Sequence, residues 1–212
     1  AHRIGLHEPH PDVVGEVVVG GSGGRFDGQA HAPILAARSS PGPHPDRTAP
    51  DCDTGPVTPA IAHLEREGIG FTVHEYDRGE DLRDFGREAA EALGLPHDQV
   101  FKTLLVDVDD RRDPIVVVVP VSCKVSMKLA AVAVGAKKAT MCAPGDAERI
   151  TGYVVGGISP LGQRKRLRTV LDETVELFDT IYVSGGRRGL DLGLAPDDLV
   201  RLLDATVAPI TG

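Results

Sequence analysis

The sequence predicts an α+β fold, in which helices pack against a mixed sheet. From residue 58 onward, helical and strand patterns follow one another without the regular strand–helix–strand rhythm of a doubly wound protein. The most apolar run, PIVVVVPV at 114–121, is far shorter than the roughly 20 residues that span a bilayer. It predicts a buried strand, and no membrane association is expected. A chain of 212 residues, 41% of them hydrophobic, suffices for one ordinary domain with an appendage.

Residues 1–57 differ in composition from the rest of the chain. They contain nine glycines and eight prolines, no lysine and a single aromatic residue. This composition is typical of a flexible or disordered arm. VVGEVVVGG at 13–21 has strand character, but nothing nearby in the sequence would pair with it. The sequence therefore predicts an arm at 1–57 and a folded domain at 58–212.

The first elements of the domain have clear start and stop signals. Thr58 can cap a helix that has Pro59 in its first turn and stops at Gly68. GFTVHEY at 70–76 alternates apolar and polar residues, which predicts a half-buried strand. FGREAAEALGL at 85–95 predicts a second amphipathic helix.

The middle of the chain predicts a β-hairpin followed by two short helices. VFKTLLVDVD at 100–109 and the apolar run at 114–121 flank the polar turn DRRD. Ser126 can cap a helix that runs to Gly135, and a short helix is predicted at 143–150.

The last third predicts two strands, at 169–175 and 180–186, with a short helical or turn segment between them. Gly185 and Gly186 are expected to form a hairpin turn. Pro196 opens a final helix.

Charge and cysteine content narrow the functional classes. A formal net charge of -8 argues against broad, non-specific nucleic-acid binding, although a local basic face is compatible with it. The three cysteines, Cys52, Cys123 and Cys142, are too few and too scattered for a disulfide framework or a CxxC zinc site. No secretory signal is visible, so a reducing cytoplasm is favoured. The histidines lack metal-ligand spacing, and neither a metal nor a cofactor is predicted.

A glycine-rich loop followed by a basic cluster is the first candidate site. The loop contains Gly156, Gly157, Ser159 and Pro160, and such a backbone allows close approach by a ligand. The basic residues that follow could attract a phosphate-bearing ligand; they are Arg164, Lys165 and Arg166. Composition alone equally allows a tight turn beside a solvated basic edge strand.

Three further residues could contribute to a site. Lys102 lies in the apolar strand VFKTLLV, where a lysine either reaches an edge or is held in a cleft for an anion. Asp191 lies between two leucines and either faces solvent or pairs with a cation in a cleft. Tyr76 ends its strand and could serve as a core residue, a rim residue or a hydroxyl donor. No GxSxG elbow is present, and the cysteines of the domain are more typical of structural thiols.

Several motifs in order resemble the YbaK/EbsC family of aminoacyl-tRNA deacylases, relatives of the editing domain in bacterial prolyl-tRNA synthetases. The motifs are TPAI at 58–61, FKTLLV at 101–106, GAKKATM at 135–141, TGYVVGGISPLGQRKRL at 151–167 and TIYVSGGRRGLDL at 180–192. The resemblance runs from about Thr58 to Ile210. It implies a mixed α/β fold with a curved central sheet surrounded by helices, and a pocket for the aminoacylated 3′ end of tRNA.

The resemblance also implies an activity. It is hydrolysis of the ester in mischarged Cys-tRNA(Pro), with the substrate's own thiol attacking the ester carbonyl and with prolyl-tRNA synthetase as a possible partner. By motif position, Lys102, Tyr76 and Asp191 correspond to functional residues, and Lys102 would contact the 3′-terminal nucleotide. The loop with Gly156, Gly157, Ser159 and Pro160 would line the pocket, and the basic cluster would meet the tRNA acceptor end.

The sequence departs from the family pattern in one segment, and it leaves two alternative functions open. CKVSMKLAAVAVG at 123–135 is more apolar than the family's usual sequence, which bears on amino-acid specificity. The first alternative is a deacylase for another small amino acid on the same scaffold. The second is a non-catalytic module that binds the tRNA acceptor end.

Overall fold

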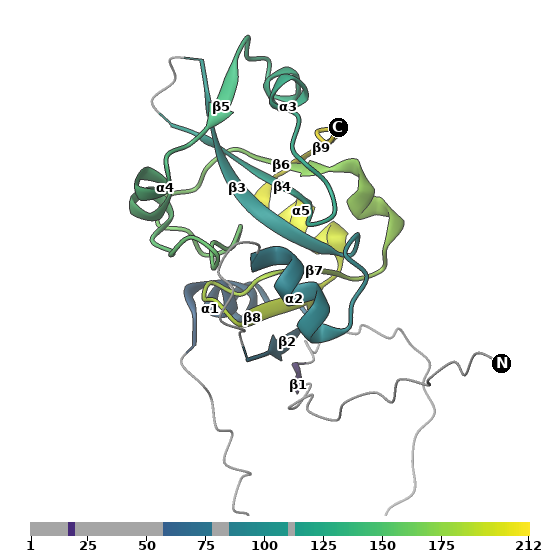
Figure 1. Cartoon of the computed structure of the whole chain (residues 1–212). Coiled ribbons are helices and arrows are strands. Elements are labelled where there is room, and N and C mark those ends of the chain that lie inside the picture. The colour runs from purple at the N-terminus through teal and green to yellow at the C-terminus, as the bar shows by residue number, and fades with distance from the viewer. Residues whose placement is uncertain (1–16, 20–56, 78–84, 110–112) are drawn as a thin grey trace, which may run out of the picture.

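A central mixed sheet organises the molecule (Figure 1), as seen in a computed structural model that describes residues 17–19, 57–77, 85–109 and 113–212. Within these residues the strand order is β1-β2-β8-β7-β3-β4-β6-β9, and β5 pairs separately with β3. The strands are β1 (Val17–Val19), β2 (Phe71–Glu75), β3 (Val100–Val108), β4 (Ile115–Pro120), β5 (Ala139–Met141), β6 (Thr169–Asp172), β7 (Ile181–Ser184), β8 (Leu190–Leu194) and β9 (Thr206–Ala208). Three pairs are parallel, namely β3–β7, β4–β6 and β6–β9, and the others are antiparallel.

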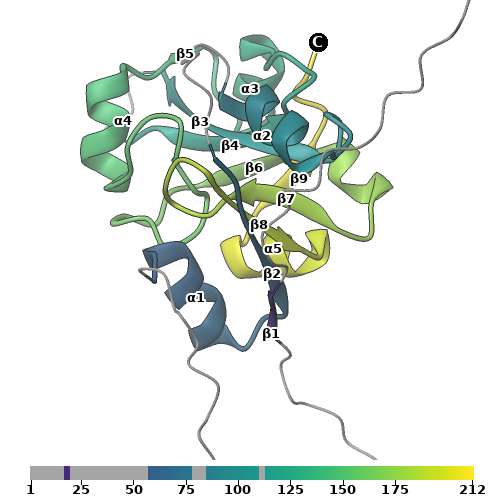
Figure 2. The same cartoon turned by 60° about the horizontal axis from the view of Figure 1, so that its bottom comes forward.

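Helices cover both faces of the sheet (Figure 2). They are α1 (Pro59–Glu67), α2 (Phe85–Leu93), α3 (Met127–Ala133), α4 (Pro144–Thr151), α5 (Pro196–Leu203) and the 3-10 helix η1 (Glu173–Leu177). On one face, α1, α4 and α5 pack with alternate strand residues such as Val116 and Val118. On the other face α3 packs with Val117 and Val119, while α2 packs with Val100 at the end of β3. Burial on both faces explains why the apolar run in β4 has no polar residue.

The α+β class predicted from the sequence is confirmed, as are its best-marked elements. Helix α1 begins after Thr58, whose hydroxyl accepts a hydrogen bond from the amide of Ile61, and it ends at Gly68. The predicted hairpin is the antiparallel pair of β3 and β4, in which Phe101 lies opposite Pro120. Its turn residues 110–112 lie outside the described residues.

One predicted strand is too long. The segment 169–175 was expected to be extended throughout, but β6 ends at Asp172 and η1 begins at the next residue. The cause is local, because the Asp172 carboxylate accepts hydrogen bonds from the amide and the hydroxyl of Thr174. An aspartate in this role favours a turn over continued extension.

Two short strands, β5 and β9, were not predicted from the sequence. β5 and β9 have only three residues each, which is too short for an alternation to stand out. β1 corrects the expectation that the segment 13–21 would find no partner, because Val17 lies opposite Val73 on β2. The remainder of the predicted arm, 1–16 and 20–56, lies outside the described residues. Among the helices of the described residues, none has the length and apolar character needed to cross a membrane.

Candidate active site

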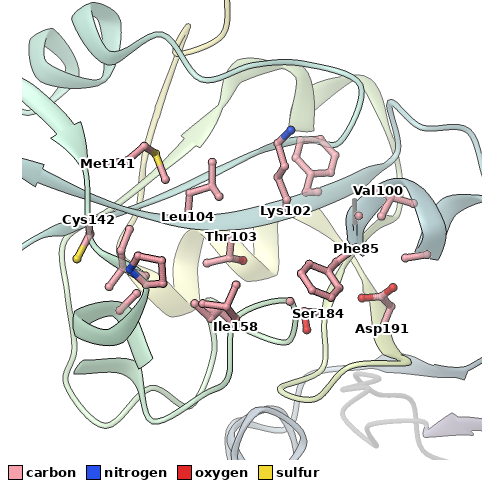
Figure 3. A pocket seen from close by; sticks show the side chains of 18 of the residues that line it. Phe85, Val100, Lys102, Thr103, Leu104, Met141, Cys142, Ile158, Ser184 and Asp191 are labelled. Carbon is pink, nitrogen blue, oxygen red and sulfur yellow. The ribbon is translucent and has the colours of Figure 1, made fainter. Parts of the chain in front are cut away.

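A cavity of about 280 Å³ opens beside β3 and is the candidate active site (Figure 3). Its walls come from α2, β3, the start of α4, the glycine-rich loop and the β7–β8 hairpin. Lys102 and Thr103 lie on opposite sides of β3 in the close view, so the cavity reaches both faces of the strand. This size suits a small ligand group rather than a large one.

The cavity exists because β3 lacks a partner strand along part of one edge. β4 pairs with one edge of β3 from Phe101 to Val106. The opposite edge pairs with β7 only at Val100 and Phe101, and with β5 only from Val106 onward. Among the described strands, none pairs with this edge between those points. The sheet therefore has an opening at 102–104.

Polar groups of Thr103 face this opening. On this edge the carbonyl of Gln99 accepts from Tyr182 N, and that of Leu105 accepts from Cys142 N, each at 3.0 Å. Because backbone groups alternate between the two edges of a strand, the N–H and C=O of Thr103 point the same way. Its side-chain hydroxyl is buried and has no hydrogen-bond partner within the described part of the chain. A buried polar atom of this kind is unfavourable unless a ligand or water satisfies it.

Asp191 places a carboxyl group in the same cavity. It lies on β8 opposite Ser184 of β7, and only 4% of its surface is exposed. Burial raises the pKa of Asp191 to about 6, although a hydrogen bond with the Tyr76 side chain opposes the rise. Its Oδ2 atom has no hydrogen-bond partner among the described residues. At neutral pH the cavity thus holds a carboxylate with one oxygen ready to accept from a cation.

Lys102 lies on the other side of β3. Its Nζ donates to the carbonyl of Cys123 at 2.7 Å and to that of Val121 at 3.4 Å. These two bonds fix the ammonium group near the start of the loop after β4.

The glycine-rich loop forms another wall. Gly156 has φ +87°, and a Cβ atom there would lie 2.7 Å from the ring of Phe85. Phe85 in turn lies under the guanidinium of Arg188, which is 5.0 Å from the ring centroid. Gly157 packs against the backbone of Arg187, where a Cβ atom would lie 2.8 Å away. The loop and the β7–β8 hairpin therefore contact each other directly behind the cavity.

The cavity contains a thiol that is poorly suited to nucleophilic attack. Cys142 is buried, and burial together with the nearby Asp107 raises the pKa of its thiol to about 11. A nucleophilic cysteine needs the opposite shift, toward thiolate at neutral pH. Ser184 also lines the cavity, yet the described lining residues include no histidine that could serve as its base. Among the described residues, no group of three or more His, Cys, Asp or Glu side chains is arranged to hold a metal ion.

Comparison with known proteins agrees with this geometry. The family model of the "Aminoacyl-tRNA editing domain" matches residues 80–202, more than half of the chain. The chain belongs to this family. The editing domain is 35% identical to "Putative Cys-tRNA(Pro)/Cys-tRNA(Cys) deacylase EbsC" of Enterococcus faecalis, over 73% of this chain and 93% of that protein. It is 25% identical to "Uncharacterized protein YwhH" of Bacillus subtilis, over 59% of this chain and 82% of that protein.

Solved structures show the same fold. "Crystal structure of a putative trans-editing enzyme for prolyl tRNA synthetase" matches with a TM-score of 0.65 and 24% identity, over 73% of this chain and 95% of that one. "Crystal structure of hypothetical protein APE2540" matches with a TM-score of 0.65 and 22% identity, over 73% of this chain and 100% of that one. The fold implied by the sequence resemblance is confirmed for the editing domain.

The structure brings four of the predicted site residues to one cavity, namely Lys102, Tyr76, Asp191 and Gly156. The other three loop residues, Gly157, Ser159 and Pro160, are buried but are not among the lining residues. Their part in the site stays a prediction. Ser159 is fully buried, and its hydroxyl accepts from the amide of Leu161, which indicates that it shapes the loop.

The predicted basic cluster follows this loop but is not part of the cavity wall. Lys165 forms an ion pair with Asp113, with 2.6 Å between Nζ and Oδ1. The side chain of Arg164 lies over Gly152. Arg166 is exposed and close enough to α1 to lower the pKa of His63. The assignment of these three residues to tRNA binding stays a prediction.

Sequence reasoning missed Thr103, Ser184 and Phe85 as lining residues of the editing domain. Thr103 and Phe85 occur within segments that were singled out, but no local signal shows that they face a cavity. The opening in the sheet depends on where β5 and β7 pair with β3, and β5 was not predicted. Phe85 was assigned only to an amphipathic helix, which is its local structure but not its contribution to the site.

Proposed function

We propose that this chain removes cysteine from mischarged Cys-tRNA(Pro) by cleaving the aminoacyl ester. One observation carries the proposal: Asp191 is buried in a small cavity with an unpartnered oxygen, and the Lys102 ammonium lies across β3 from it. The aminoacyl end of a charged tRNA has a cationic α-ammonium group close to an anionic phosphate. The Asp191 carboxylate inside the cavity is placed to bind the α-ammonium group, and the Lys102 ammonium on the opposite side of the strand is placed to bind the phosphate.

The substrate would supply the nucleophile. Its thiol sulfur forms a bond to the ester carbonyl carbon, the bond from that carbon to the ribose oxygen breaks, and the thiol proton passes to the departing oxygen. Water then opens the resulting thiolactone to free cysteine. The raised pKa of Cys142 supports this route, because the one thiol among the described lining residues is held protonated at neutral pH.

The protein's contribution would be to position the reacting atoms and stabilise developing charge. Asp191, oriented by the Tyr76 hydroxyl, holds the α-ammonium group. The N–H of Thr103, on the unpaired edge of β3, is the donor we assign to the ester carbonyl oxygen as it gains charge. The amide of Gly157 is already used, because it donates to the carbonyl of Val154 at 2.9 Å. Lys102 contacts the phosphate of the 3′-terminal nucleotide.

Deacylation assays with Cys-tRNA(Pro), Ala-tRNA(Pro) and Ser-tRNA(Pro) test the proposal, using wild type and Lys102→Ala. We expect wild type to release cysteine only, and Lys102→Ala to lose most of that activity. Hydrolysis of all three substrates would support deacylase activity but show that no substrate thiol is needed. Binding of tRNA without hydrolysis would leave a non-catalytic module. The exposed Lys128→Ala is a matched control, since this lysine lies on α3 and does not line the cavity.

We further propose that the tRNA acceptor end meets Arg164, Lys165 and Arg166, and that prolyl-tRNA synthetase helps to deliver the tRNA. The net charge of -8 supports assisted delivery, because an acidic protein attracts tRNA weakly by itself. Adding the synthetase at limiting deacylase should therefore speed cysteine release. An equal rate with and without the synthetase would contradict the second part of this proposal.

A further inference from the structure

Helix α1 holds the glycine-rich loop through a histidine that the site itself does not contain. The amide of Gly162 donates a hydrogen bond to Nδ1 of His63 at 3.1 Å. The loop backbone also sits directly on the first turn of α1, because a Cβ atom on Gly162 would collide with the carbonyl of Pro59. The end of the loop is thus anchored to α1 by one side-chain bond and close backbone packing.

This anchor is connected to the wall of the cavity within a few residues. The Ser159 hydroxyl accepts from the amide of Leu161, and the Tyr153 hydroxyl donates to the carbonyl of Leu161 at 2.8 Å. Ile158, the neighbour of Ser159, lines the cavity together with Gly156. A shift at Gly162 would therefore be transmitted through a short, internally bonded segment to the cavity.

The bond to Gly162 requires a neutral imidazole. A backbone amide can only donate, so Nδ1 of His63 must be the unprotonated nitrogen and Nε2 must carry the proton. Adding a proton to Nδ1 would place two donors face to face and remove the bond. The interaction is therefore one that acid breaks.

The surroundings of His63 favour its neutral form at neutral pH. Partial burial lowers the pKa of His63 below 6.5, and the positive charges of Arg66 on α1 and Arg166 beyond the loop lower it further. Glu67 acts in the opposite direction but does not reverse the shift. Protonation of His63 is thus expected only below its ordinary range.

We propose that His63 is a positioning residue, whose neutral imidazole holds the loop 156–162 against α1 and whose protonation releases it. The structural part of this proposal is independent of the reaction. Its consequence for catalysis rests on the proposed function: deacylation should have an acid-sensitive step that belongs to His63 and is separate from the titration of Asp191.

The chain offers an internal reference for this experiment. α1 also holds the β7–β8 hairpin, because the Thr58 hydroxyl donates to the carbonyl of Gly185 at 2.5 Å. Neither of these groups titrates near neutral pH. The amide of Gly185, bonded to the carbonyl of Leu190 at 2.8 Å, should therefore report a loop attachment that does not respond to His63.

The first test is amide hydrogen exchange in the free protein at pH 7.5 and 5.5, for wild type, His63→Asn and His63→Leu. Asparagine presents an oxygen close to the position of Nδ1 and does not titrate, whereas leucine presents no acceptor. We expect the protection factor of the Gly162 amide to fall on acidification of wild type, as His63 gains a proton and its bond to Gly162 is lost. It should stay constant in His63→Asn and be low at both pH values in His63→Leu. The protection of Gly185 should not change.

The second test is the ratio of kcat/KM at pH 7.5 to that at pH 5.5 on Cys-tRNA(Pro). Asp191 contributes to this ratio equally in all variants, so a smaller ratio in His63→Asn than in wild type isolates the histidine. His97→Asn, at a half-buried site beside Glu91 and outside the cavity wall, should behave as wild type. Equal Gly162 protection in all variants at both pH values would overturn the proposal, even in a fully active enzyme. If exchange responds as expected while no substrate is cleaved, the proposed function fails and the loop attachment stands.

Discussion

Asp191 provides a carboxylate for the candidate site and lowers the stability of the folded protein at neutral pH. Its carboxyl group is only 4% exposed, and burial raises its pKa from 3.8 to about 6. A raised pKa in the folded state means that folding favours the protonated form. The stability contribution of this proton is therefore fully present below pH 3.8 and is lost as pH rises through about 6. At neutral pH the protein carries a buried charge that opposes folding.

Asp191→Asn should accordingly stabilise the protein at pH 8 while impairing the reaction. We expect the free energy of unfolding at pH 8 to rise by up to about 2–3 kcal/mol, because the penalty for the buried charge is removed. Urea unfolding at pH 8 and pH 4 would measure this, and the gain should vanish at the lower pH. On Cys-tRNA(Pro), kcat/KM should fall at least tenfold through loss of the charged partner of the α-ammonium group.

Asp179→Asn, at an exposed position, is the control and should change neither quantity. A destabilised Asp191→Asn protein at pH 8 would show that the carboxylate has a stabilising partner in the folded state besides Tyr76. That result would contradict the unpartnered oxygen on which the proposed function depends.

At the scale of elements, the site depends on how the glycine-rich loop meets α2. Gly156 has a positive φ and lies against the ring of Phe85, so both its conformation and its lack of a side chain are used. Gly94, at the end of α2, has a similar conformation with φ +64°, yet no atom lies within 4 Å of the position of a Cβ atom. Both glycines therefore need a positive φ, but only Gly156 also lies against a neighbouring side chain.

Gly156→Ala and Gly94→Ala form a matched pair for this reason. Each should lose about 1 kcal/mol of stability from the positive φ alone. Gly156→Ala should lose more and should also lower deacylation, because its methyl group displaces Phe85 from the cavity wall. Thermal unfolding and kcat/KM for both variants check this. Equal activity in the two variants would mean that the contact between Gly156 and Phe85 does not shape the site.

At the scale of the whole molecule, the balance of charge limits how tRNA can bind. The net charge is -8, and several basic residues near the site already have partners. Lys165 pairs with Asp113, Arg187 pairs with Glu75, and the Arg188 guanidinium donates to the carbonyl of Val155. These described cations near the site are therefore already engaged, which suits brief capture of the 3′ end rather than tight binding.

The dependence of tRNA affinity on salt measures how many phosphates are contacted. With the four proposed contacts, from Lys102, Arg164, Lys165 and Arg166, a plot of log affinity against log salt concentration should have a slope of about -2.8. Arg166→Ala should reduce the magnitude of that slope by about 0.7, whereas Arg201→Ala on α5 should leave it unchanged. A steep slope that persists in Arg166→Ala would place the main tRNA contact elsewhere on the surface.

The sequence by itself determined the local elements and the family. Thr58 and Ser126 predicted helix starts, because a capping side chain needs only the neighbouring amides. The apolar runs on either side of DRRD predicted a hairpin, because the two strands are joined by a short turn in the sequence. The motifs identified the scaffold and brought Lys102 and Asp191 forward as candidates.

Only the tertiary structure decided what these residues do together. The opening beside Thr103 results from where β5 and β7 end their pairing with β3. Asp191 was compatible with solvent or a cleft until the packing of both faces of the sheet buried it. The bond from Gly162 to His63 joins residues 99 positions apart. Local patterns carry no information about such contacts, because the energy of burial and of long-range hydrogen bonds exists only after the chain has packed.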